Sequence, residues 1–224
     1  MIEAVVFDLD DTLYLERDYV RSGFAKVAET LEELGIARAR VVFEHLWREF
    51  EAGRRGDAFD SLSLDFPFDD RISVLDLVDL YRAHQPTISL LDPDEFAALG
   101  RLPLPLGLIS DGVVRAQLAK MEALGLLAGF DAVILTGRWG RDFWKPHPRA
   151  FETVEDELGM PGDRLAYVAD NPAKDFIAPN RRGWTSIRLR MEGQLHYEAE
   201  PMQSDSHPQV ELSSLAGLIR LLRL

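Results

Sequence analysis

Short apolar runs that end at polar residues recur along the chain, and they predict the strands of a sheet. The first run covers 4–7, is rich in β-branched side chains and stops at an aspartate. Four similar runs cover 106–109, 132–135, 165–168 and 186–189. Continuous apolar runs are typical of strands that are buried on both faces, as in parallel sheets. Because helical or loop stretches separate the runs, the pattern predicts an α/β fold with a parallel sheet.

The long stretch between the first two runs has helical rather than strand spacing. Apolar residues recur at steps of three and four over 20–34, and the same pattern returns twice before residue 84, which predicts amphipathic helices. A connection of this length without its own structure is unusual in a compact domain. We therefore predict that residues 16–88 form an α-helical insertion and that 1–15 and 89–224 form the core. An irregular extension of that core is the alternative.

After the last predicted strand the pattern changes twice. Residues 191–209 are polar and acidic and contain two prolines, which predicts a loosely packed surface excursion. Leucine and isoleucine then return to helical spacing over 212–224, so we predict a final helix that covers the sheet. Ser213 and Ser214 are candidate caps for the beginning of this helix.

Composition and charge narrow the class of protein. With 224 residues, of which 46% are hydrophobic and 28% charged, the chain matches ordinary globular usage and can hold a core with a cleft. The formal net charge of −13 opposes binding to nucleic acid. The absence of cysteine excludes disulfides, thiol nucleophiles and cysteine-ligated zinc. The amino-terminal apolar run is too short for a signal or membrane segment, so we expect a cytoplasmic protein with no membrane partner.

Reactive side chains follow the ends of four predicted strands. They are Asp8 and Asp10 after the first, Ser110 after the second, Lys145 in the loop after the third and Asp170 after the fourth. Ligands of open α/β sheets bind beyond the carboxyl ends of the strands. One such residue fits a polar turn that merely ends a strand. Reactive residues at four strand ends in this order indicate a site that combines a nucleophile, a hydroxyl, a cation and a metal ligand.

These residues resemble the four signatures of the haloacid dehalogenase superfamily, namely Asp-x-Asp-x-Thr, a Ser or Thr, a Lys and a late acidic pair. In this sequence they are the segment from Asp8 to Thr12, Ser110, Lys145, and Asp170 with Asp175. The resemblance covers about residues 3–15 and 105–190. It implies a Rossmann-like parallel sheet core with an inserted α-helical cap of the C1 type at 16–88.

The resemblance also implies the chemistry of the site. Asp8 attacks phosphorus and forms a covalent aspartyl-phosphate, while Asp10 protonates the leaving alcohol and then deprotonates the attacking water. These roles need different protonation states, so we expect Asp10 to keep a proton that Asp8 gives up. Ser110, the Gly112 amide and Lys145 bind the phosphate oxygens.

A magnesium ion, Mg2+, is the implied cofactor. Oxygen ligands suit this ion, and the resemblance assigns them to the side chains of Asp8 and Asp170 and to the carbonyl of Asp10. Thr12 and Asp175 are expected to support these ligands from behind.

One departure from the family pattern adds a negative charge beside the expected phosphate site. Asp111 stands where relatives often have asparagine. We expect its side chain to point away from the phosphate and to cap the helix that begins near Val113.

The sequence thus predicts a magnesium-dependent phosphatase for a small phosphorylated metabolite, acting as a monomer or homodimer. The cap would restrict entry to small substrates. A phosphomutase or a haloacid dehalogenase of the same superfamily is an alternative, although a dehalogenase has no leaving alcohol to protonate and needs no metal. A phosphoaccepting signalling module is an alternative of another class. The long insertion disfavours it, because such a module needs no lid over a substrate.

Overall fold

The computed structural model of the protein describes residues 1–68 and 70–222. Contacts within the chain divide it into two compact units. We call Met1–Arg17 together with the chain from Ser89 onward the core unit, and Asp18–Ile88 the helical unit. The action of the helical unit as a cap stays a prediction.

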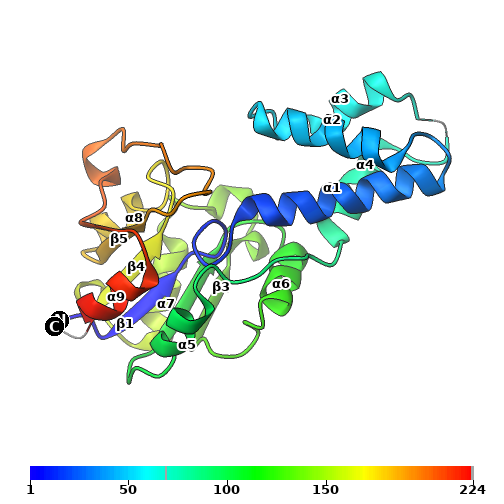
Figure 1. Cartoon of the computed structure of the whole chain (residues 1–224). Coiled ribbons are helices and arrows are strands. Elements are labelled where there is room, and N and C mark those ends of the chain that lie inside the picture. Colours follow the sequence, from blue (N-terminus) through cyan, green and yellow to red (C-terminus); the bar gives the residue numbers. More distant parts are fainter. Residues whose placement is uncertain (69, 223–224) are drawn as a thin grey trace. The chain divides into compact units, whose positions relative to one another are not determined.

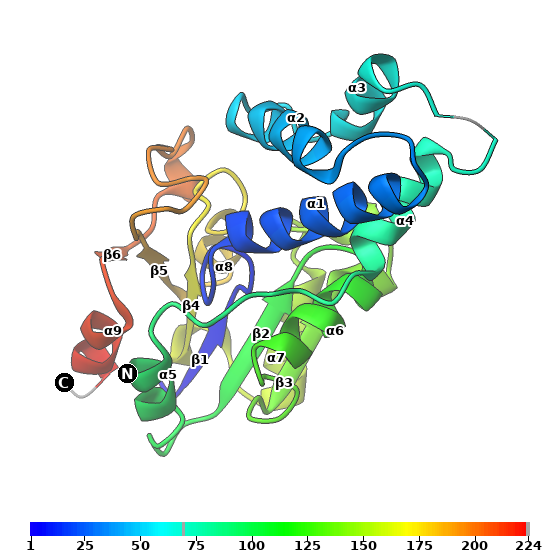
Figure 2. The same cartoon turned by 45° about the vertical axis from the view of Figure 1, so that its right-hand side comes forward.

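Strands and helices alternate through the core unit, whereas the regular elements among the described residues of the helical unit are all helices (Figures 1 and 2). The strands are β1 (Ala4–Phe7), β2 (Leu106–Ser110), β3 (Ala132–Leu135), β4 (Leu165–Ala169), β5 (Thr185–Leu189) and β6 (Val210–Leu212). The α-helices are α1 (Glu16–Glu33), α2 (Ala39–Glu51), α3 (Ala58–Asp65), α4 (Val74–Ala83), α5 (Pro93–Leu99), α6 (Val114–Ala123), α7 (Arg149–Leu158), α8 (Ile177–Arg181) and α9 (Leu215–Leu222). Short 3-10 turns are η1 (Thr136–Arg138), η2 (Arg141–Phe143), η3 (Gly162–Arg164) and η4 (Ser204–Ser206). None of the helices within the described ranges has the length and apolar character that crossing a membrane requires.

The core unit is built on one parallel sheet. Its strands lie in the order β3-β2-β1-β4-β5-β6, and every neighbouring pair is parallel. β1 pairs with β2 through Val5 and Leu106 and with β4 through Val5 and Ala166, so it lies inside the sheet, as both views show (Figures 1 and 2). From β1 the chain builds outward through β2 and β3 and then returns to the other side of β1 at β4. Ligands of such sheets bind where the strand order reverses.

The predicted α/β fold with a parallel sheet is confirmed, and each predicted strand lies within one residue of its observed bounds. The sequence missed β6, because three residues with the exposed Glu211 in the middle carry little apolar signal. Since β6 ends at Leu212, the final helix begins at Leu215 rather than at 212. The Ser214 hydroxyl accepts a hydrogen bond from the Gly217 amide at 3.3 Å, as a cap does. The last two residues of the predicted helix lie outside the described part of the chain.

Residues 191–209 lie mainly at the surface, as predicted, but hydrogen bonds tie the segment to the core unit at two places. Gln194 is buried, and its Nε2 donates to the carbonyl oxygens of Asp11 at 2.6 Å and Leu189 at 2.9 Å. Farther along, Asn180 donates to the carbonyl of Asp205 at 2.8 Å. The polar composition correctly predicts exposure of most of the segment, but it does not show that Gln194 and Asn180 satisfy backbone groups that join the segment to the core unit.

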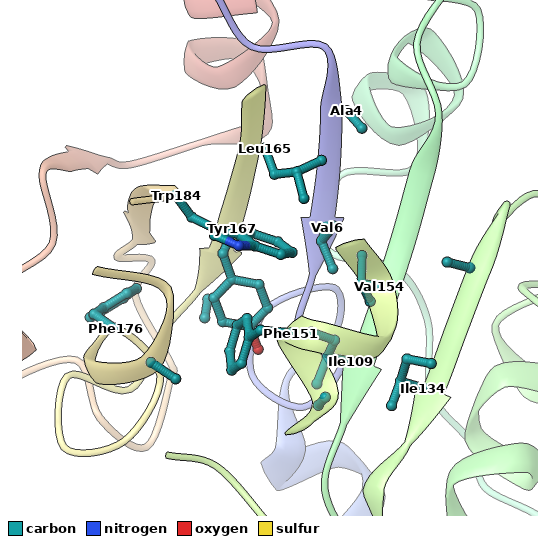
Figure 3. Packing of buried hydrophobic residues seen from close by; sticks show 14 residues of the cluster. Ala4, Val6, Ile109, Ile134, Phe151, Val154, Leu165, Tyr167, Phe176 and Trp184 are labelled. Carbon is teal, nitrogen blue, oxygen red and sulfur yellow. The ribbon is translucent and has the colours of Figure 1, made fainter. Parts of the chain in front are cut away.

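A cluster of apolar side chains supports β1 and β4 from one face of the sheet (Figure 3). Phe151 on α7 packs edge-on against Tyr167 and Trp184, with ring centroids 5.0 Å and 5.4 Å apart. This geometry suits the charge distribution of aromatic rings. Val6 on β1 belongs to the same cluster and is fully buried. Because burying one large apolar side chain contributes about 1.5–3 kcal/mol, the cluster gives the strand ends a rigid base.

Aromatic contacts hold the helical unit together. Phe24 on α1 contacts Phe50, Phe59 and Tyr81, with ring centroids 5.8–6.4 Å apart. Gly23 lets α1 and α4 approach, because a Cβ atom at this position would lie 2.4 Å from the ring of Tyr81. The spacing of apolar residues correctly predicts α1, α2 and α4, whereas the short α3 has too few apolar positions to stand out.

Candidate active site

Asp8 and Asp10 follow the carboxyl end of β1, where the chain leaves the sheet. The amide of Asp8 donates to the carbonyl of Val168 at 2.9 Å, so β1 and β4 stay paired up to their carboxyl ends. Asp11 then has a φ of 55°, in the left-handed region that aspartate tolerates better than most residues. The tight turn ends the strand, and Asp8 and Asp10 stand at its beginning.

Lys145 lies at the centre of a buried charge cluster. Its Nζ contacts Asp8 Oδ1 at 2.6 Å and Asp175 Oδ1 at 2.9 Å, and it donates to the Tyr167 hydroxyl at 2.9 Å. The side chain of Lys145 is fully buried, and an isolated ammonium there would be strongly disfavoured. Burial alone would lower the pKa of Lys145, but Asp175 and Asp8 raise it well above its usual value. The Lys145 ammonium therefore forms ion pairs with two carboxylates, those of Asp8 and Asp175.

The carboxylates around Lys145 fit a divalent cation. Oxygens of Asp8, Asp170 and Asp175 all lie within 4.8 Å of one another. Asp170 Oδ2 is buried and has no hydrogen-bond partner among the residues that the structure describes. Burial and the charges of Asp175 and Asp8 raise the pKa of Asp170 well above its usual value. Burial also raises the pKa of Asp8 to about 7, although Lys145 opposes the rise. An all-oxygen donor set with an unsatisfied carboxylate is suited to Mg2+.

Arg188 on β5 fixes the backbone of this acidic group. It is 1% exposed, and its Nε donates to the Asp170 carbonyl at 3.1 Å. Its Nη2 donates to the carbonyl of His196 at 2.8 Å. The guanidinium therefore ties the end of β4 to the polar segment after β5.

Asp10 has a different set of contacts. Lys120 Nζ donates to Asp10 Oδ1 at 2.6 Å, Gln117 Nε2 donates to Oδ2 at 2.7 Å, and the Tyr14 hydroxyl donates to Oδ1. Burial would raise the pKa of Asp10, but the charge of Lys120 and the hydrogen bonds outweigh it and lower the pKa. These contacts favour the reverse of the expectation that Asp10 keeps a proton while Asp8 gives it up. Lys120 favours ionised Asp10, whereas burial favours protonated Asp8.

The predicted phosphate-binding side chains, Lys145 and Ser110, are connected to different aspartates. Lys145 belongs with Asp8, whereas Gln117 donates to the hydroxyl of Ser110 and so joins it to Asp10. Two glycines allow the close packing here. Gly112 has a φ of 126°, and a Cβ atom on it would lie 3.2 Å from Gln117 Cδ. A Cβ atom on Gly137, in the turn after β3, would lie 2.0 Å from the Gly112 carbonyl oxygen.

Asp111 does not cap α6, which corrects the prediction. Its Oδ1 accepts from the Thr136 hydroxyl at 2.8 Å and from the Lys145 amide at 3.1 Å, and its Oδ2 pairs with Lys174 at 3.3 Å. The N-cap of α6 is Val113, whose side chain has no capping oxygen. The Asp111 carboxylate instead joins the loops after β2, β3 and β4, and Lys174 offsets its charge.

Of the two predicted supporting residues, Asp175 is itself a member of the acidic group that could hold a cation. Asp175 Oδ2 accepts from the Asn171 amide at 3.1 Å, which orients the carboxylate toward Lys145. Thr12 is fully buried, and its hydroxyl has no hydrogen-bond partner within residues 1–68 and 70–222.

Asp11 is the remaining aspartate of the first signature, and its carboxylate binds backbone amides. Its carboxylate accepts from the amides of Glu16 and Leu195, each at 2.7 Å. Burial and the charge of Glu16 raise the pKa of Asp11 to about 7. It thereby fixes the start of α1 and the segment after β5 to the signature loop.

Sequence reasoning missed Tyr14, Gln117, Lys120 and Arg188. Gln117 and Lys120 stand three residues apart on the buried face of a helix that follows Ser110 directly. Polar residues on such a face, so close to a signature residue, are a signal that helical spacing alone could have supplied. Arg188 is a charged residue inside an apolar strand, which is a similar signal.

The fold and site define a class of protein: an α/β fold whose parallel sheet gathers acidic residues at the carboxyl ends of its inner strands. The sequence model of the haloacid dehalogenase-like hydrolases matches residues 2–181, so the chain belongs to this family. It is 24% identical to the glyceraldehyde 3-phosphate phosphatase of Methanocaldococcus jannaschii over 234 aligned positions, which cover 100% of this chain and 98% of the relative. It is 26% identical to the (S)-2-haloacid dehalogenase of Xanthobacter autotrophicus, covering 76% of this chain and 68% of the relative.

The fold also matches solved structures. The HAD-hydrolase YfnB of Bacillus subtilis, described as bound to magnesium and as showing interdomain movement, aligns with a TM-score of 0.70 and 18% identity. The alignment covers 100% of this chain and 99% of that one. At this level of identity the match shows the shared fold.

Proposed function

We propose that the protein is a phosphatase that hydrolyses small phosphorylated metabolites with Asp8 as its nucleophile. The observation that supports this most is the fully buried Lys145 between Asp8 and Asp175. Phosphoryl transfer needs a nucleophile with positive charge beside it, and this cluster offers both. The relative that is named a glyceraldehyde 3-phosphate phosphatase supports the same class of reaction and a small substrate.

The proposed reaction has two steps, both on Asp8. First, a carboxylate oxygen of Asp8 attacks phosphorus, the bond to the leaving oxygen breaks, and that oxygen takes a proton from the protonated form of Asp10. Lys120 disfavours this form of Asp10 in the first step. Water then attacks the phosphorus and loses a proton to Asp10, and the bond to Asp8 breaks with its electron pair returning to the carboxylate. Ionised Asp10 beside Lys120 is suited to this second step. Ser110 and the Gly112 amide are the proposed donors to phosphate oxygens.

Mg2+ is the proposed cofactor. The side chains of Asp8 and Asp170 and the carbonyl of Asp10 would hold it, with Thr12 and Asp175 behind them. When bound, such an ion supplies positive charge for phosphoryl oxygens and favours the ionised carboxylates. The buried, unpartnered Asp170 Oδ2 supports this assignment. A cytoplasmic location and a monomeric or homodimeric state stay predictions.

Other reactions of the family are less well supported by the contacts. A dehalogenase has no leaving alcohol, so it would have no use for the three donors that hold the Asp10 carboxylate. A phosphomutase would share every contact described and differ only in where the phosphoryl group goes. A phosphoaccepting signalling module would keep the phosphoryl group on Asp8 and would have no need of a second unit such as 18–88.

Phosphate release from a panel of phosphorylated metabolites and a generic aryl phosphate tests the proposal. We expect release with Mg2+ and its loss on chelation, because Asp8 and Asp170 repel a phosphate dianion without a cation. Full activity in chelator would contradict the metal assignment. Return of the phosphoryl group to another position on a substrate would identify a mutase. A stable phosphoprotein without turnover would support the signalling alternative.

The helical unit is proposed to act as a cap that selects leaving groups. Its position as an insertion between Asp10 and Ser110 in the chain, and its own aromatic core, support this role. Replacing residues 18–88 with a short linker should broaden substrate choice while aryl phosphate hydrolysis continues. A folded variant with the same substrate preferences as the full chain would show that the unit is not a selective cap.

A further inference from the structure

The buried face of α6 carries two polar side chains that belong to none of the family signatures. Gln117 is 2% exposed and Lys120 is 5% exposed, and they lie beside the buried Ala116 and Met121. A buried lysine is costly unless a partner offsets its charge. That partner is Asp10, whose Oδ1 lies 2.6 Å from Lys120 Nζ. The polar side chains on this face of α6 therefore both contact the Asp10 carboxylate.

Gln117 joins Asp10 to the hydroxyl of Ser110. Its Nε2 has two hydrogens, and its two acceptors are Asp10 Oδ2 at 2.7 Å and Ser110 Oγ. The carboxamide cannot be reversed without turning its oxygen toward the carboxylate. Because Ser110 Oγ accepts here, its own hydrogen can point to an anion. A single amide thus orders a phosphate-binding hydroxyl and the proposed acid and base.

The two oxygens of Asp10 are held by donors from different elements. Lys120 and the Tyr14 hydroxyl both contact Oδ1, while Gln117 contacts Oδ2. Tyr14 comes from the signature loop, whereas Gln117 and Lys120 come from α6, more than a hundred residues later in the chain. Donors on both oxygens restrict rotation of the carboxylate. The side chain remains partly open to solvent, with 22% of it exposed.

We propose that Gln117 and Lys120 are positioning residues that hold the Asp10 carboxylate for the hydrolysis of the aspartyl-phosphate. This inference rests on the proposed function. In that step water attacks phosphorus, its proton passes to a carboxylate oxygen of Asp10, and the bond from phosphorus to Asp8 breaks. A carboxylate that is free to rotate would miss the water, and a displacement of about 1 Å can cost about 10²-fold in rate.

Rapid acid quenching and intact-mass measurement test the proposal, with an aryl phosphate as substrate and Mg2+ present. Lys120→Met should lower kcat by about tenfold to a hundredfold. It should lower KM along with kcat, leave kcat/KM little changed and raise the steady-state fraction of phosphorylated protein, because hydrolysis of the intermediate is the step that slows. Lys120→Arg keeps the charge and a donor, so it should restore most of the rate. Gln117→Met should act in the same direction, and it carries the test if Lys120→Met does not fold.

A double-mutant cycle separates positioning from general packing. If Lys120 acts through Asp10, Lys120→Met should have little further effect in an Asp10→Asn background. Arg115→Met removes a cation from the exposed face of the same helix and should leave both readouts unchanged. Equal losses in both backgrounds, or an unchanged phosphorylated fraction, would overturn the proposal while wild-type phosphate release still supports the proposed function. A wild-type protein that releases no phosphate would overturn both.

Discussion

Asp8 and Asp10 stand two residues apart in the sequence, yet their surroundings differ in almost every respect. Asp8 is 3% exposed and shares Lys145 with a second buried carboxylate. Asp10 is partly exposed, and it has Lys120 with two further donors. Burial raises the pKa of Asp8 to about 7, whereas Lys120 and the hydrogen bonds overcome burial and lower the pKa of Asp10.

The difference shows how a short signature acquires two chemistries. The strand β1 delivers both aspartates to one edge of the sheet, and distant parts of the chain then decide their charge. The partner of Asp8 follows β3, and the partner of Asp10 lies on α6. Asp8 shares the charge of Lys145 with Asp175, so negative charge is in excess there and favours a bound cation. The charge of Asp10 is already balanced by Lys120.

The largest effect is expected at the nucleophile. Asp8→Asn removes the attacking carboxylate, so we expect aryl phosphate hydrolysis to fall by at least about 10³-fold. No phosphorylated protein should appear at any time after rapid acid quenching. Detection of the added mass in this variant, located to another residue, would transfer the role of nucleophile to that residue.

Asp10→Asn should have a smaller effect and a different character. Phosphoryl transfer from an aryl phosphate needs little protonation of the leaving oxygen, so the first step should continue. Hydrolysis of the intermediate loses its base and should slow by about 10²–10⁴-fold. The same quenching experiment should therefore show the phosphorylated protein accumulating. Absence of accumulation, with turnover lost, would mean that the two aspartates act in one step.

The sequence could predict the fold and the signature residues because both depend on local patterns. Apolar runs fixed the positions of five strands, and side chains at strand ends must gather at one edge of a parallel sheet. It could not predict the charges of Asp8 and Asp10, which depend on burial and on Lys120. It also misjudged Asp111, since Thr136 and Lys174 are remote in sequence, and only the folded chain brings them to its carboxylate.

Stability should depend on pH in the direction set by the buried acids. Asp8 and Asp11 have pKa values of about 7 in the folded chain and ordinary values near 4 when unfolded. Between these values the folded state binds more protons, so the free energy of unfolding falls as pH rises. In chelator we expect the thermal midpoint to be about 5–10 °C lower at pH 8 than at pH 5.

Two comparisons attribute this pH dependence to the acidic cluster. Asp8→Asn removes one of the groups, so the variant should lose less stability between pH 5 and pH 8. Mg2+ should also flatten the dependence, because a bound cation favours the ionised carboxylates. A midpoint that rises with pH in chelator would show that the folded chain holds these aspartates ionised.

The smallest expected effect concerns the segment after β5, whose hydrogen bonds to the core unit the composition does not show. Gln194→Ala removes donors to the carbonyls of Asp11 and Leu189 and an acceptor for the Met191 amide. Leaving these buried groups unsatisfied should cost about 1–3 kcal/mol in the free energy of unfolding, measured with urea. Glu198→Ala, an exposed change in the same segment, should cost less than about 0.5 kcal/mol. Equal small losses would show that the segment contributes little to the fold, whereas the expected difference would make it part of the support beneath the first signature.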